Sequence, residues 1–359
     1  MSSVAAQFNQ QNEPLELRVP EAALARLALA LRRGRQNGEV WEQSLLQGAE
    51  PALVEELLDY WCDGFDFRAA EAQLNRLPLH ATSDDSEKVA FLHLRSKRPD
   101  AIPLLLLHGS FGSPLELAAL FEPLRDPAQH GGRPSDAFHV VCPALPGFGI
   151  TAAHASDLAH IAELCAELMA SLGYRRYVAH GCELGAALAR ELAACDAQHL
   201  AGALLGDCPA YPEPEPHALA QLSSEEKSRL ALLDEYFAAR TLREPDGPVG
   251  LLAAAVAQLD DPNPLELRDA LLFGLSLSSI GDPALQARLR RARAHEGPRS
   301  TRPLGVCSFP LDLPSLRRLA EARHRVVHWC EPEQGGCLPG LEQPQLLRDQ
   351  LVEFSARFR

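Results

Sequence analysis

The stretch HGCELG at residues 180–185 decides the fold that the rest of the sequence has to fit. It follows YRRYVA, which is typical of a β-strand, and it leads into AALARELAA, which is typical of a helix. A sharp turn between a strand and a helix, with glycines on both sides of one exposed residue, is how some enzymes present a nucleophile. The residue at the tip of this turn is Glu183, which is not a usual nucleophile.

The composition excludes several classes of partner. The 359 residues leave room for one large domain with an elaboration or for two domains, and 46% of them are hydrophobic, which is enough for a substantial core. A formal net charge of −14 argues against nucleic acid or an anionic membrane surface, because either would need a basic face. No apolar run approaches the roughly 20 residues of a membrane span. A small uncharged or cationic substrate fits these features best.

The cysteines and the N-terminal residues predict the compartment. Nine cysteines, an odd number, are scattered without any CxxC pair, which speaks against a disulfide framework and against a zinc ribbon. The first residues, MSSVAAQFNQQNEPLE, lack the basic and apolar regions of a signal peptide. We therefore expect a cytoplasmic protein that uses neither a metal nor a cofactor.

Short apolar runs of strand length alternate with helical patterns along most of the chain. The runs are VAFLHLRS (89–96), IPLLLLH (102–108), FHVVCP (138–143), YVAH (177–180), AGALLGD (201–207), PLGVCSFP (303–310) and HRVVHW (324–329). Amphipathic helices are predicted at residues 158–173 and 184–195. This alternation predicts an α/β fold, in which helices cover both faces of a mostly parallel central sheet.

Two stretches interrupt the alternation and divide the chain into four segments. Residues 1–80 carry two helical patterns before the first strand and predict an N-terminal extension packed on the core. Residues 211–296 show helical periodicity without strand candidates and predict an inserted helical cap. Residues 81–210 and 297–359 are then the first and second parts of the core.

Candidate site residues follow the ends of the predicted strands, where ligands bind in open α/β sheets. After one strand, His108, Gly109, Ser110 and Phe111 begin a glycine-containing loop whose backbone N–H groups could stabilise an oxyanion. Other strands lead to the elbow, to Asp312 in FPLDLP and to Cys337 in WCEPEQGGCLPG. Each place also has an ordinary explanation, since glycines make turns and Asp312 could cap a helix. The four together are more specific than any one of them.

With these motifs in place, the sequence resembles the microsomal-type epoxide hydrolases, which include the juvenile-hormone epoxide hydrolases. The resemblance covers most of the chain and adds the α/β-hydrolase fold as an expectation. It rests on LELRVPEAALARLALALRR (15–33), LLDYWCDGFDFRAAEAQLNRLP (57–78), CPALPGFGIT (142–151), DGPVGLLA (246–253) and VHWCEPEQGGCLPGLEQPQLL (327–347).

The resemblance implies a two-step mechanism, and this sequence departs from it. In the family an aspartate attacks the epoxide, a histidine oriented by an acid activates water, and two cap tyrosines donate to the epoxide oxygen. The matching positions hold Glu183 for the nucleophile, Asp312 for the acid and Cys337 for the histidine. Tyr236 lies where the first cap tyrosine could be, and residues 272–289 offer none for the second. Phe111 replaces the family's proline in the oxyanion loop.

Nothing nearby in the sequence clearly replaces the missing base. The thiol of Cys337 is a poor proton shuttle beside two carboxylates. His180 precedes the elbow, His328 is expected to be packed inside a strand, and Asp207 is a substitute acid that cannot replace a histidine. Because losing a general base costs about 100-fold to 10,000-fold, a covalent ester at Glu183 should accumulate.

Three hypotheses follow. The first is a repurposed enzyme, for example of secondary metabolism, in which Glu183 transfers protons during epoxide opening, cyclisation or isomerisation of a hydrophobic small molecule. The second is a catalytically inactive homologue that binds a ligand or a partner, and the third is a true epoxide hydrolase with unusual residues. Cys182 and Leu184, beside Glu183, are expected to line the pocket, and either Cys182 or Cys337 could be a rescuing nucleophile. Association through the cap or the extension could give a homodimer.

Overall fold

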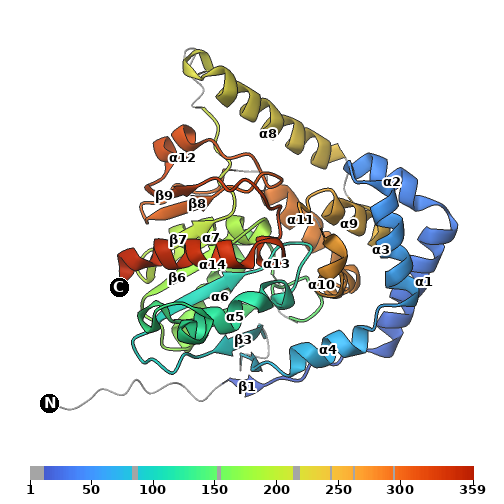
Figure 1. Ribbon diagram of the computed structural model, residues 1–359, viewed down its shortest axis with the longest axis horizontal. Helices are drawn as coiled ribbons and strands as arrows, with labels where there is room; N and C mark the ends of the chain where they lie inside the picture. Colours follow the sequence, from blue (N-terminus) through green and yellow to red (C-terminus); the bar gives the residue numbers. More distant parts are fainter. Residues whose placement is uncertain are drawn as a thin grey trace.

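The computed structural model describes residues 12–82, 88–151, 155–212, 219–242, 245–261, 263–293 and 296–359, without the side chains of residues 236–242. Its strands form one sheet in the order β1-β2-β3-β5-β4-β6-β7-β8-β9 (Figure 1). The strands are β1 (Glu13–Pro14), β2 (Leu79–Ala81), β3 (Ala90–Leu94), β4 (Ile102–Leu107), β5 (Phe138–Pro143), β6 (Tyr177–Gly181), β7 (Leu200–Leu205), β8 (Leu304–Cys307) and β9 (Val326–Cys330). From β5 to β9 all neighbours are parallel, whereas β1, β2 and β3 add an antiparallel edge. The predicted α/β-hydrolase fold is confirmed.

Both faces of the parallel strands are buried, which explains why they read as continuous apolar runs. Side chains alternate along β4, so that Leu105 and Leu107 join one hydrophobic cluster while Leu104 and Leu106 join another. The first cluster contains residues of helices α6 and α7, and the second contains residues of α5 and α14. These helices are α5 (Ala118–Arg125), α6 (Leu158–Ser171), α7 (Leu184–Cys195) and α14 (Pro344–Ser355).

A third hydrophobic cluster joins the N-terminal helices to the helices inserted between β7 and β8. The N-terminal helices are α1 (Glu21–Gln36), α2 (Glu39–Gln47), α3 (Pro51–Asp63) and α4 (Phe67–Asn75). The inserted helices are α8 (Ser224–Leu242), α9 (Gly247–Val256), α10 (Arg268–Ile280) and α11 (Pro283–Arg293). Leu57 of α3 and Leu252 of α9 are fully buried in this cluster, and Trp61 Nε1 donates a hydrogen bond of 3.0 Å to Ser276 Oγ. The limits of the four sequence segments remain a prediction.

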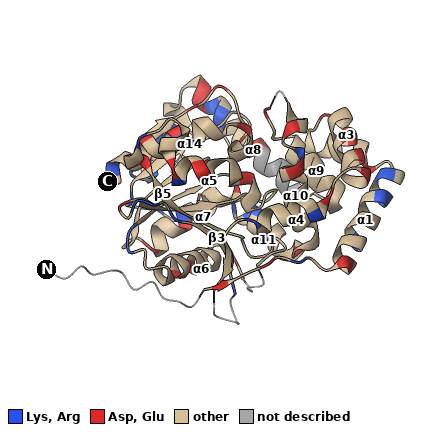
Figure 2. Cartoon of the chain, turned by 60° about the horizontal axis from the view of Figure 1, so that its bottom comes forward, with Lys and Arg blue, Asp and Glu red and all other residues tan. Residues whose placement is uncertain are grey.

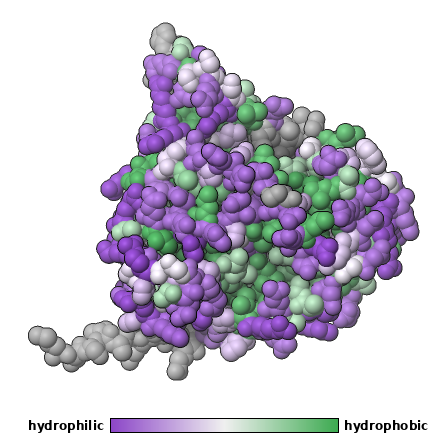
Figure 3. Space-filling model, in the orientation of Figure 1, coloured by the Kyte–Doolittle hydropathy of each residue, from purple (hydrophilic) through white to green (hydrophobic). Residues whose placement is uncertain are grey.

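The helical layer lies over one end of the sheet, and this arrangement positions the site. Figure 1 shows α1 to α4 and α9 to α11 together on the side away from the C-terminus, with α8 projecting above them. On the face drawn in Figure 3, hydrophobic residues gather near the middle of the molecule, between the sheet and these helices. The short helices α12 (Arg317–Arg323) and α13 (Pro339–Glu342) complete the second part of the core. Within the described ranges, no helix combines the length and the apolar character needed to cross a bilayer.

Candidate active site

The turn between β6 and α7 has the geometry of a nucleophile elbow. Glu183 sits at its tip with φ 55° and ψ −123°, a conformation that costs about 1–3 kcal/mol for a residue with a side chain. Two glycines make the turn possible. A Cβ on Gly181 would lie 2.2 Å from the backbone of Gly185, and a Cβ on Gly185 would lie 2.3 Å from Leu107 O. The strained tip and its flanking glycines together place the single side chain of Glu183 at the carboxyl end of β6.

The carboxylate of Glu183 turns back into a pair of backbone donors. Its Oε2 accepts hydrogen bonds of 2.6 Å from Ser110 N and from Leu184 N, which are the donors expected of an oxyanion hole. Gly109 leaves room for this arrangement, because a Cβ there would lie 3.2 Å from Oε2. The other oxygen, Oε1, accepts a hydrogen bond of 2.9 Å from Arg293 Nη1. These charge-assisted bonds stabilise Glu183 as an anion.

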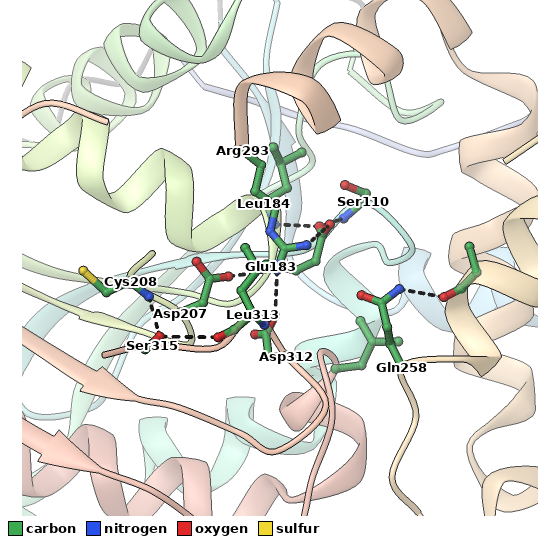
Figure 4. Close-up of polar contacts among 12 residues, drawn as sticks. Ser110, Glu183, Leu184, Asp207, Cys208, Gln258, Arg293, Asp312, Leu313 and Ser315 are labelled. Carbon is green, nitrogen blue, oxygen red and sulfur yellow. Dashed lines mark hydrogen bonds and ion pairs between the residues drawn. The ribbon is translucent and has the colours of Figure 1, made fainter. Parts of the chain in front are cut away.

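Arg293, at the end of helix α11, joins three carboxyl groups in one buried cluster (Figure 4). Its Nη2 donates hydrogen bonds of 2.9 Å to Asp207 Oδ2 and of 2.6 Å to Asp312 Oδ1, in addition to the bond from Nη1 to Glu183. Asp207 Oδ1 also pairs with Arg190 Nη1 at 3.2 Å. The side chains of all five residues are at most 2% exposed. The structure thus brings Glu183, Asp207 and Asp312 together around a guanidinium group.

The charges of this cluster make Asp312 the site of a proton. Three carboxylates against two guanidinium groups leave one unbalanced negative charge in a region without water contact. Burial, reinforced by the neighbouring Asp207, raises the pKa of Asp312 to about 7, although Arg293 acts in the opposite direction. Within the described part of the chain, Asp312 Oδ2 receives no hydrogen bond, so it is free to carry the proton. The site therefore holds a fixed anion at Glu183 and a carboxyl group that titrates near neutral pH at Asp312.

Cys337 lies on a loop that is tied to the inserted helices. Its backbone N–H donates to Gln258 O at 3.1 Å, and a Cβ on the preceding Gly336 would lie 1.8 Å from the same oxygen. Glu342 holds this loop by accepting from Gly336 N, Leu338 N and Asp260 N at 2.6–3.0 Å. The thiol is fully buried, and burial followed by the charge of Asp312 raises its pKa well above the usual range. Cys337 is therefore a neutral thiol and no replacement for a basic histidine.

The two histidines that precede the candidate loops are neutral because they are buried. His108 Nε2 accepts from Leu145 N at 3.0 Å, which leaves the proton on Nδ1 to bond with Gly109 O at 2.9 Å. His180 Nδ1 donates to Leu204 O at 2.8 Å, and its Nε2 lies 3.6 Å from Cys182 Sγ. Burial lowers the pKa of each histidine to about 4. His328 is packed, as expected, and bonds to Gln350 Oε1 at 2.7 Å.

The remaining predicted site residues separate into those near Glu183 and those elsewhere. Cys182 and Leu184 flank Glu183 and are buried, and burial raises the pKa of the Cys182 thiol well above its usual range. Phe111 is fully buried in the cluster formed by the N-terminal and inserted helices, so it anchors the oxyanion loop to them. The side chain of Tyr236 lies outside the described residues. Within the described ranges, no group of three or more His, Cys, Asp or Glu side chains is arranged to hold a metal ion.

Comparisons with known proteins show the family of this chain. Residues 12–117 match the model "Epoxide hydrolase N terminus", and residues 104–352 match the model "Alpha/beta hydrolase family". A Stigmatella aurantiaca protein named "Putative epoxide hydrolase" is 34% identical over 96% of this chain and 85% of its own length. This chain belongs to the epoxide hydrolase family. Two solved epoxide hydrolases share its fold. The Aspergillus niger epoxide hydrolase has a TM-score of 0.77 and 22% identity, over 98% of this chain and 97% of that chain. The juvenile hormone epoxide hydrolase of Bombyx mori has a TM-score of 0.71 and 20% identity, over 97% of this chain and 95% of that chain.

In this epoxide hydrolase homologue, the buried cluster around Glu183 contains two arginines, Arg190 and Arg293, that the sequence-based prediction did not include. Arg190 carried a signal, because it is a charged residue in the middle of the otherwise apolar helix LGAALARELAAC and is 1% exposed. A charge at such a position requires a buried partner. Arg293 carried none, because it is one of several arginines in the run RLRRAR at the end of α11. Only the packing of α11 against the core distinguishes it.

Glu116 is a further buried carboxyl group of the oxyanion loop. Its Oε1 accepts from Gly109 N at 3.0 Å, and within the described residues its Oε2 has no hydrogen-bond partner. Burial raises the pKa of Glu116 to about 8 from an ordinary value of 4.5. The folded protein therefore keeps this proton up to about pH 8, whereas the unfolded chain releases it near pH 4.5. The stability that Glu116 contributes is complete at low pH and is lost as the pH rises towards 8.

Glu116→Gln is expected to reduce the pH dependence of stability. The wild-type protein should lose about 1.4 kcal/mol of unfolding free energy per pH unit through this group between pH 5 and pH 8. Glutamine keeps the acceptor for Gly109 N and has no proton to lose, so the variant should be more stable than the wild type at pH 8. Urea unfolding at both pH values measures the difference, and the exposed Glu122→Gln is the control. A Glu116→Gln slope equal to that of the wild type would contradict the assignment.

Proposed function

We propose that this epoxide-hydrolase-like enzyme opens the epoxide ring of a hydrophobic small molecule by direct acid–base transfer, without a covalent ester. Glu183 is the base and Asp312 is the acid. The observation that carries the proposal is the Glu183–Arg293–Asp312 cluster, in which one guanidinium group bonds to both carboxyl groups. Hydrophobic helices over the site favour an apolar substrate, as in the sequence-based hypothesis.

The two carboxyl groups differ in the way that acid–base catalysis needs. Glu183 accepts from two backbone N–H groups and from Arg293, which favours its ionised form. Asp312 has one oxygen without a donor in the described structure and a pKa of about 7, which favours a proton at or below neutral pH. Acid–base catalysis commonly uses two carboxyl groups whose surroundings give them different pKa values, so that one is ionised and the other is protonated.

The proposed step balances without a cofactor. Glu183 Oε1 removes a proton from a hydroxyl group, either of water or of the substrate, and that oxygen attacks one carbon of the ring. The carbon–oxygen bond of the epoxide breaks, and Asp312 gives its proton to the departing oxygen. The product is a diol if water attacks and a larger cyclic ether if the substrate's own hydroxyl attacks. A proton then returns from Glu183 to Asp312 and restores the resting site.

The ester route of the family is less compatible with this site. Attack by Glu183 Oε1 would place the ester carbonyl among the backbone donors, but hydrolysis of the ester needs a base near it. The histidine position holds a neutral thiol, and His108 and His180 bond to the backbone. Direct transfer needs only the two carboxyl groups that are present.

Oxygen labelling distinguishes the routes. The protein, in excess over each of a panel of hydrophobic epoxides, is incubated in H₂¹⁸O, and both product and intact protein are weighed by mass spectrometry. Direct transfer predicts ¹⁸O in the diol of the first turnover, or an unlabelled isomer of the substrate if its own hydroxyl attacks, with Glu183 unlabelled. An unlabelled first-turnover diol followed by labelled Glu183, or a stable adduct on Glu183, would contradict direct transfer and support an ordinary epoxide hydrolase.

A second candidate function is ligand or partner binding without catalysis. The observation that favours it is burial, because Glu183, Asp207 and Asp312 are all closed to solvent and Arg293 covers Glu183 Oε1. A substrate reaches that oxygen only if Arg293 or its neighbours move. Neither product nor adduct across the panel, together with saturable binding of the same epoxides, would support this second function.

A further inference from the structure

A basic residue precedes each of four neighbouring parallel strands. Arg176 comes directly before β6, His199 before β7 and Arg325 before β9, while Arg302 stands two residues before β8. Since β6, β7, β8 and β9 are consecutive in the sheet and run in the same direction, their amino ends meet at one edge. This edge is opposite the carboxyl ends, where Glu183 follows β6.

These residues line a pocket of about 240 Å³, which also includes Arg175. Its apolar lining residues are Leu200, Ala201, Pro303 and Phe358. Arg176 Nη1 donates to Phe358 O at 3.1 Å, which fixes one wall of the pocket. Figure 2 shows several blue segments, which are Lys or Arg residues, near the C-terminus.

Three of the four arginines of the pocket have no direct carboxylate partner among the described residues. Within the described part of the chain, the guanidinium groups of Arg175, Arg302 and Arg325 form no ion pair and no hydrogen bond, and no lining residue is Asp or Glu. Asp196 pairs with the histidine of the pocket, since its Oδ1 bonds to His199 Nδ1 at 2.6 Å. This bond orients the ring and leaves Nε2 for a ligand. The chain has a net charge of −14, so four arginines in one concave site are not needed to keep it soluble. Their grouping is instead typical of a site that binds an anion.

We propose that this pocket binds the phosphate groups of a small phosphorylated ligand. Guanidinium groups that converge from separate strands can share several oxygens of one group, and phosphate offers more charge and more acceptors than a single carboxylate. The size of the pocket suits a pyrophosphate-sized group. The pocket shares no residue with the Glu183 cluster. This proposal therefore does not depend on the proposed acid–base chemistry.

Calorimetric titration with inorganic pyrophosphate tests the site. We expect saturable binding of one pyrophosphate per chain, weakened by added sodium chloride. The double variant Arg302→Gln/Arg325→Gln should bind at least about tenfold more weakly, because it removes two charge-assisted partners. Arg26→Gln/Arg33→Gln is the matched control, since it removes two exposed arginines of α1 and the same total charge. Its affinity should equal that of the wild type.

Three results would overturn the proposal. They are the absence of saturable binding by the wild type, an equal loss of affinity in both double variants, and tighter binding of citrate than of pyrophosphate at the same ionic strength. The thermal unfolding midpoint of each variant is measured first. If the thermal unfolding midpoint of Arg302→Gln/Arg325→Gln is lowered, binding is measured instead with Arg302→Lys/Arg325→Lys. This variant keeps the charge and must retain binding if the pocket is the site.

Discussion

Glu183→Gln is expected to lower kcat for epoxide opening by about 100-fold to 10,000-fold in a folded protein. The amide can still accept a hydrogen bond from Ser110 N and Leu184 N, so the elbow keeps its anchor. Glutamine cannot remove a proton from the attacking hydroxyl group. Its NH₂ group also replaces the carboxylate oxygen that accepts the hydrogen bond from Arg293 Nη1. Product formation on the epoxide that reacts best in the panel, followed by mass spectrometry, gives the rate.

Glu183→Asp separates the acid–base route from the ester route. Aspartate is shorter by one methylene, so its carboxylate cannot bond to the two backbone donors and to Arg293 as glutamate does. Direct transfer therefore predicts a slower Glu183→Asp protein, whereas a nucleophilic role predicts a protein at least as fast as the wild type. Glu122→Gln, an exposed change, controls for the loss of a carboxylate elsewhere. Full activity in Glu183→Gln would refute a catalytic role for Glu183.

Arg293→Met is expected to lower the free energy of unfolding by about 3–5 kcal/mol at neutral pH. The change removes the guanidinium group that bonds to Glu183, Asp207 and Asp312, and these buried carboxyl groups then lack compensation. Urea unfolding at pH 7 measures the loss. Arg288→Met is the matched control because it lies on the exposed side of the same helix and should change stability by no more than about 0.5 kcal/mol.

The pH dependence of Arg293→Met tests the cause. Without the guanidinium group the folded protein takes up protons on the carboxyl groups of the cluster more readily than the unfolded chain does. Stability should then be highest at low pH and should fall as the pH rises, more steeply than in the wild type. Adding Glu183→Gln to Arg293→Met should recover part of the loss at pH 7, because it removes a buried charge whose guanidinium partner is already gone. A loss below about 1 kcal/mol for Arg293→Met would show that the ion pairs do not compensate the buried carboxylates.

The strands, the helices and the order of the candidate residues can be predicted from the sequence alone. The runs at 102–108, 138–143 and 177–180 became β4, β5 and β6 because both faces of those strands are buried, and such strands are read directly from hydrophobicity. The turn around Glu183 can also be predicted from the sequence, because a side chain at Gly181 or Gly185 would clash with the backbone and both positions therefore need glycine. Asp312 and Cys337 were expected at the strand ends because parallel strands end at a common edge.

The contacts that hold the buried carboxyl groups cannot be predicted from the sequence and are seen only in the folded chain. Glu183 bonds to Arg293, 110 residues away, and the same guanidinium group reaches Asp207 and Asp312. Periodicity shows which residues of a helix are apolar, but it does not give the angle at which α11 packs on the core. That angle places one arginine of RLRRAR in the site and leaves Arg288 exposed. A pattern of neighbours along the chain cannot encode a contact that depends on the packing of distant elements.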